Sequence, residues 1–186
     1  MQAISLALCG IFGLTSCQTG LLGGSLGSIA NDSPLTTPSA PISITSGGKY
    51  SGSWASYDSN TPAVTISTNE PVVIQNSTIT SKGDLIEVLG SGSGANVTIQ
   101  NVIGVALDPE IAGKQRGKFL LAISANALTV EHCTMTGVSF GVYVVDSTLV
   151  TLTVSNNAAN DMEDRASDGH GGFTSQRPDL VPCFRE

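Results

Sequence analysis

The chain has 186 residues and a formal net charge of −7 at pH 7, with 12% charged and 5% aromatic residues. Its wealth of Gly, Ser, Thr, Asn and Val favours strands and turns over long surface helices, and the length suits one domain. Only eight residues are Lys or Arg, so the composition argues against nucleic acid as a partner, because phosphate binding needs clustered cations.

The N-terminal segment reads as a processing signal. An apolar run from Ala3 to Leu14 has about the length of a signal-peptide core and is too short to span a bilayer. It ends in Leu14-Thr15-Ser16-Cys17, which resembles the bacterial lipobox. The resemblance implies that residues 1–17 are a lipoprotein signal peptide and that Cys17 is lipidated. A lipid anchor would then be the only membrane attachment, at the outer membrane or cell surface of a bacterial envelope.

A signal peptide normally opens with Lys or Arg, whereas only Met1 and Gln2 precede this apolar run. The alternative for the segment is that Cys17 sits in an ordinary cleaved signal peptide. The protein would then be secreted. Residues 18–40, which follow, are rich in Gly, Ser, Thr and Pro and carry no repeating apolar pattern. They predict a flexible tether, with the folded body beginning near Pro41.

An internal repeat predicts the fold of that body. Four segments align without gaps: Pro71–Asn76, Asn96–Asn101, Ala127–His132 and Thr151–Asn156. Their central apolar residues are separated by 25, 31 and 24 residues, and they are Ile74, Ile99, Val130 and Val154. These intervals lie in the range of solenoid repeats. Residues two positions earlier share the same face of each strand, which predicts a second interior column of Val72, Val97, Leu128 and Leu152.

Further positions of the repeat extend this prediction. The next position on the inner face predicts an inward ladder where the chain turns, formed by Asn76, Asn101, His132 and Asn156. A second strand is indicated because Ile86 and Val88 match Val142 and Val144 at identical offsets, with Leu121 and Ile123 as the pair between them. The displacement of that middle pair predicts an insertion over residues 108–118.

Repeats of this length with short strands resemble the right-handed parallel β-helix of the pectin-lyase-like superfamily. The stretch from Asn156 to Gly169 also resembles a segment of uncharacterised exported bacterial members. The resemblance implies an all-β, right-handed parallel β-helix of about four to five rungs over residues 41–169. Residues 170–186 then form an irregular tail or cap. Superfamily members usually have more rungs, so the chain resembles a truncated relative or a fragment.

The insertion supplies the first candidate site. Lys114, Arg116 and Lys118 lie close together on it, and such a loop on a β-helix flank could hold uronate carboxylates. A polysaccharide lyase would also use basic residues, to neutralise the substrate carboxylate and to take a proton. A solvated charged loop is the plain alternative.

Acidic residues supply a second candidate site. Asp161, Glu163, Asp164 and Asp168 follow the last predicted strand, and three of them, Asp161, Asp164 and Asp168, are candidate calcium ligands because Ca²⁺ prefers clustered oxygens. The alternative is again a solvated loop. Gly169-His170-Gly171 is similar to a tripeptide of β-helix polygalacturonases, but the adjacent Asp pair expected upstream is missing, which favours a glycine-rich turn.

Two functions remain open at this point. The first is a non-catalytic surface module that binds polysaccharide or an envelope partner. The second is a lyase or glycoside hydrolase acting on acidic polysaccharide, for which no catalytic set is assigned. Cys133 and Cys183 could pair in an oxidising compartment or stay free.

Overall fold

The folded part of the chain is built from strands. The structure, a computed structural model, describes residues 37–91, 93–145, 149–162, 165–171 and 173–174. Within these ranges every regular element is a β-strand, and none of the described residues forms a helix that could cross a membrane. The predicted signal peptide, Cys17 and nearly all of the predicted tether lie outside the described residues.

One face of the fold is a parallel sheet of five short strands, called here the short-strand sheet. In spatial order its members are β1 (Ile42–Ile44), β4 (Val64–Ile66), β6 (Ile86–Val88), β8 (Leu120–Ala122) and β11 (Val142–Val144). Each strand pairs in parallel with the strand of the next turn, so the chain returns to this sheet once per turn.

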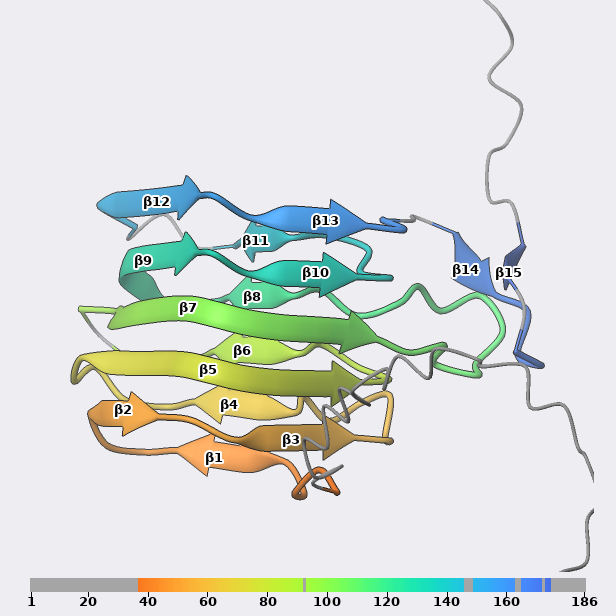
Figure 1. The fold of residues 1–186 in the computed structure, drawn as a ribbon, viewed down its shortest axis with the longest axis horizontal. Coiled ribbons are helices and arrows are strands. Elements are labelled where there is room, and N and C mark those ends of the chain that lie inside the picture. The colour runs from red at the N-terminus through yellow and green to blue at the C-terminus, as the bar shows by residue number, and fades with distance from the viewer. Residues whose placement is uncertain (1–36, 92, 146–148, 163–164, 172, 175–186) are drawn as a thin grey trace, which may run out of the picture. The chain divides into compact units, whose positions relative to one another are not determined.

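The opposite side is an eight-stranded parallel sheet, called here the long sheet. Its members are β2 (Gly48–Tyr50), β3 (Ser53–Ser56), β5 (Val72–Ser81), β7 (Ala95–Ala106), β9 (Ala125–Glu131), β10 (Thr134–Thr136), β12 (Thr151–Ser155) and β13 (Ala158–Asn160). Figure 1 shows these strands stacked in front of the short-strand sheet. The two sheets close about five turns of a right-handed parallel β-helix, which confirms the predicted fold class.

The parallel strands end at Asn160, before the predicted boundary at Gly169. A small antiparallel hairpin follows, made of β14 (Ala166–Ser167) and β15 (Phe173–Thr174). The hairpin is tied to the insertion, because Ser167 N donates to Lys114 O at 2.8 Å. It therefore adds a cover to the flank of the solenoid rather than a further turn.

The predicted interior columns are confirmed by the strand register. Ile74 pairs with Ile99, Ile99 with Val130, and Val130 with Val154. The first three are fully buried, whereas Val154 is 50% exposed because no described turn covers it. The apolar stack is thus continuous from β5 to β12 and open at its last member.

One predicted pair was wrong by a single residue. The buried partners of Ile86 and Val88 are Leu120 and Ala122, while Ile123 is exposed. A shift by one residue moves a strand's side chains to the opposite face. The run from Phe119 to Ile123 is apolar at every position, so its sequence carries no alternation that could identify the inner face.

The predicted inward ladder was also wrong. Asn76, Asn101, His132 and Asn156 are exposed, with φ between 49° and 55°. They occupy the left-handed conformation that bends the long sheet, a role for which Asn is suited because its short polar side chain tolerates positive φ. Amide pairs between turns do occur, but at other positions: Gln100 Nε2 donates to Gln75 Oε1 at 2.9 Å, and Asn126 Nδ2 to Asn96 Oδ1 at 3.0 Å.

A cationic cleft as the candidate functional site

A cleft of about 400 Å³ lies where the chain crosses from the long sheet to the short-strand sheet. It is lined by four successive connections, at residues 57–63, 82–85, 107–119 and 137–141, and by Glu87 in the middle of β6. Because consecutive turns stack along the solenoid axis, the cleft runs parallel to that axis. The lining residues that carry charge are Lys82, Asp84, Glu87, Lys114, Arg116 and Lys118.

The charge of this site contrasts with that of the chain. Four of the eight Lys and Arg residues line it, although the whole chain carries a formal charge of −7. The structure therefore brings the three predicted residues Lys114, Arg116 and Lys118 to one site. We call this site, with Lys82, the cationic cleft.

Lys114 shows how the insertion is held. Its Nζ donates to Ser59 O at 2.6 Å and to Asn60 Oδ1 at 2.9 Å, two neutral oxygens on a connection of an earlier turn. Gly113 N and Lys114 O pair with the backbone of Ser167. The insertion thus folds back over the flank and fixes the ammonium group at the cleft.

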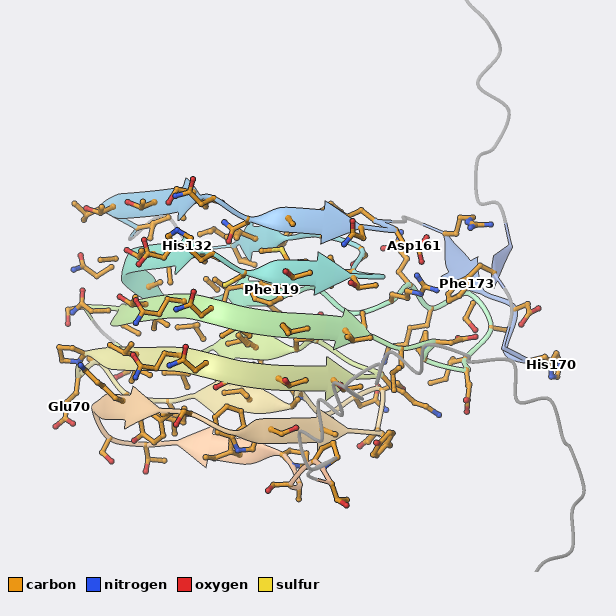
Figure 2. All side chains as sticks on the ribbon, viewed as in Figure 1. Glu70, Phe119, His132, Asp161, His170 and Phe173 are labelled. Carbon is orange, nitrogen blue, oxygen red and sulfur yellow. The ribbon has the colours of Figure 1, made fainter. Side chains whose placement is uncertain are left out.

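Arg116 connects the cleft to the end of the chain's described part. Its guanidinium donates to Asp161 Oδ2 at 2.9 Å and lies 4.1 Å from the centroid of the Phe173 ring. Figure 2 shows Asp161 and Phe173 on the same side, at the end of β13 and in β15. The Nε atom of Arg116 is buried and has no hydrogen-bond partner among the described residues. Arg116 is therefore held on several sides, chiefly by packing and one ion pair.

The other two cations have carboxylate partners. Lys82 Nζ lies 2.6 Å from Glu110 Oε2, on a carboxylate side chain that is 57% exposed. Lys118 Nζ lies 3.6 Å from Asp84 Oδ1, and the same carboxylate oxygen accepts from Lys118 N at 2.7 Å. Ion pairs with exposed partners contribute only about 0–1 kcal/mol. An incoming anion can therefore compete for Lys82 at little cost.

The environment of Glu87 disfavours the charged form of its carboxyl group. Burial raises the pKa of its carboxyl group, the nearby Asp84 carboxylate raises it further, and the Lys118 ammonium opposes both effects. Glu87 points outward from the middle of β6, where register places it beside Thr65 and Leu121. It thus lies between the cleft and the outer face of the short-strand sheet.

Lys82 was missed by the sequence reasoning. The prediction grouped cations by closeness in sequence, and Lys82 lies in the equivalent connection one full turn before the insertion. The available signal was the repeat itself, because the connection after Ser81 corresponds to the connection after Ala106, which carries the insertion. Counting basic residues at equivalent positions would have found it.

The predicted calcium site stays a prediction. Asp161 forms an ion pair with Arg116, and Asp168 Oδ1 accepts a hydrogen bond from His170 N at 2.7 Å. Glu163 and Asp164 lie outside the described residues. Within the described part of the chain, no three acidic, His or Cys side chains are grouped as metal ligands. Figure 2 shows His170 at the outer end of the β14–β15 hairpin.

Cys133 is a free thiol in the core. Burial raises its pKa, which favours the unreactive protonated form. Cys183, its predicted alternative partner, lies outside the described residues.

The chain matches no protein-family model, no curated protein and no solved structure. Fold and site alone therefore define its class: a parallel β-helix with a cationic cleft along one flank.

Proposed function

We propose that the protein is an exported, lipid-anchored β-helix module that binds acidic polysaccharide in the cationic cleft. The observation that carries the proposal is the gathering of half of the chain's basic residues in one cleft of an acidic protein. Basic side chains that serve only to interact with solvent would instead be spread over the whole surface.

The geometry of the cleft suits a repeating anion. Neighbouring strands of a parallel sheet lie about 4.8 Å apart, which is the rise of the solenoid per turn. The cations are therefore distributed along the solenoid axis over several turns. A polyuronate chain likewise presents one carboxylate on every sugar. Asn60, Gln115 and Ser139, which also line the cleft, offer polar groups for sugar hydroxyls.

The N-terminal sequence supports the location. A lipobox ending in Cys17, followed by a Gly-, Ser- and Pro-rich tether, would hold the β-helix outside the membrane, where envelope and environmental polysaccharides occur. The likeness of the repeat to the pectin-lyase-like superfamily points to the same class of ligand, by analogy of fold.

Calorimetric titration with polygalacturonate tests the binding proposal, with neutral dextran as the comparison. We expect binding of polygalacturonate alone, weakening steeply with added salt because the contacts are ionic. Lys114→Ala and Lys118→Ala should each weaken binding by about fivefold or more. Lys49→Ala, which removes an exposed cation from β2, is the matched control and should leave the affinity unchanged. Equal losses in all three variants, or no binding, would overturn the proposal.

A second candidate is catalysis in the same cleft. The Asp84 carboxylate helps to raise the pKa of the Glu87 carboxyl group, and two neighbouring carboxyl groups are the arrangement used for general acid and base chemistry. The cleft lysines could alternatively serve a lyase. New reducing ends would reveal a hydrolase and unsaturated uronate a lyase, and absence of both from a panel of acidic polysaccharides would exclude this candidate.

A further inference from the structure

Two aromatic side chains lie exposed beside the cationic cleft. Phe140 is 40% exposed and Tyr143 42% exposed, and their ring centroids are 5.4 Å apart with planes tilted by 54°. Phe140 directly follows Ser139, which lines the cleft. Leaving two adjacent aromatic rings in water is unfavourable, so a pair of this kind marks a candidate binding surface.

The backbone holds this pair in a fixed position. Phe140 O accepts from Phe119 N at 2.9 Å, and Gly141 O accepts from Leu120 N at 3.0 Å, both in the turn before. Tyr143 lies in the middle of β11 and pairs with Leu121 of β8. The rings therefore project from the ladder of the solenoid and are preorganised for a ligand.

Lys118 joins the aromatic pair to the cleft. Its Nζ lies 3.6 Å from Asp84 Oδ1 in the cleft and 5.5 Å from the centroid of the Tyr143 ring. Register places Glu87, Leu121 and Tyr143 in one outward column over three consecutive turns. A chain leaving the cleft past Glu87 would reach Tyr143 about two turn spacings further on, roughly 10 Å.

We propose that Phe140 and Tyr143 form a stacking surface at the end of the cationic cleft nearest β11. The ligand is then an extended chain of acidic sugars rather than one sugar acid or a compact anion. This inference rests on the proposed function and adds the length and chemical class of the ligand. A pyranose ring has an apolar C–H face that packs on an aromatic ring, while its carboxylate stays within reach of Lys118. Cations alone would suit any anion, and aromatic rings alone would suit any apolar partner.

Calorimetric titration with galacturonate, its dimer and its hexamer tests the inference, with inorganic phosphate as a compact anion. We expect the affinity to rise with chain length. Tyr143→Ala and Phe140→Ala should each weaken hexamer binding by about five- to tenfold, but leave the weak binding of galacturonate and phosphate in the cleft unchanged. Tyr143→Phe should retain wild-type affinity, because stacking needs the ring and not the hydroxyl group.

Val150→Ala is the matched control, since Val150 is 79% exposed and does not line the cleft. Thermal unfolding of each variant checks that the fold is intact. If the hexamer binds Tyr143→Ala and Phe140→Ala as tightly as wild type while Lys114→Ala weakens it, the stacking surface is refuted and the proposed function stands. If wild-type protein binds no galacturonate oligomer, both are refuted.

Discussion

Gly104 and Phe119 fill one site in the core between them. A Cβ atom on Gly104 would lie 2.6 Å from two ring carbons of Phe119 and 2.7 Å from Leu85 Cδ2. Gly104 stands in an interior column between Ile79 and Met135, so a small residue there leaves space that the fully buried Phe119 ring occupies. Figure 2 shows Phe119 inside the solenoid, behind the strands of the long sheet. The last residue of the connection that carries the insertion is therefore also a core residue.

Changing either partner should destabilise the protein. Gly104→Val should lower the free energy of unfolding by about 1–3 kcal/mol through overpacking. Phe119→Ala should lower it by about 3–5 kcal/mol through loss of a buried ring and creation of a cavity. Urea denaturation measures both. Because the residues share one site, Gly104→Ala combined with Phe119→Leu should cost less than the sum of the single changes. Simple additivity would show that positions 104 and 119 do not share one site.

A second prediction concerns the residues at which the long sheet bends. Asn101 has φ of 53°, a conformation that a β-branched residue adopts only with strain. Asn101→Val should therefore lower the free energy of unfolding by about 1–2 kcal/mol, and Asn101→Gly by less than about 0.5 kcal/mol. Urea titration of the two variants measures the difference. Equal stability of the Val and Gly variants would argue against a left-handed bend at this position.

Glu87 predicts a pH dependence of stability. Its pKa in the folded protein is raised, so the folded state holds the proton more tightly than the unfolded chain. Ionisation of Glu87 therefore destabilises the folded protein. This destabilisation is absent at pH values below the pKa of Glu87 in the unfolded chain. It grows as the pH rises between that pKa and the higher pKa of the folded state, and it is fully present above the latter. Glu87→Gln should thus raise the free energy of unfolding at pH 7, by about 0.5 kcal/mol or less because the site is partly solvated. The gain should vanish below about pH 4. A gain that persists at low pH would assign it to packing instead.

Cys17 carries the prediction about delivery. In a bacterial host that processes lipoproteins, the full chain should incorporate labelled fatty acid, and Cys17→Ala should abolish the incorporation. Cys183→Ala is the matched control and should label like wild type. Labelling that survives Cys17→Ala would remove the lipid anchor from the account and leave an ordinary secreted protein as the alternative.

The fold could be predicted because its signal recurs once per turn. Ile74, Ile99 and Val130 recur once per turn within alternating segments, at intervals of 25 and 31 residues, and two independent columns agree on the register. Where alternation fails, as from Phe119 to Ile123, the sequence could not identify the inner face. The inward ladder was wrong for a related reason, since a residue at a left-handed bend leaves the alternation of the strand.

The candidate site was predicted only in part. Lys114, Arg116 and Lys118 were found because one short insertion carries them, but their partners come from distant turns. Lys82 lies nearby only because the turns stack, and Tyr143 approaches Lys118 only because β11 follows β8 in the short-strand sheet. Such neighbours depend on the register, which must be known before the site can be assembled.

Chemical-shift mapping tests the central claim most directly. Nitrogen-labelled protein is titrated with the galacturonate hexamer, and the backbone amide signals are followed. We expect the largest shifts in the connections that carry Ser59, Lys82 and Lys118, with smaller shifts on the outer face of the long sheet. If instead the largest shifts fell on the long sheet around Gln75 and Gln100, the cationic cleft would not be the binding site.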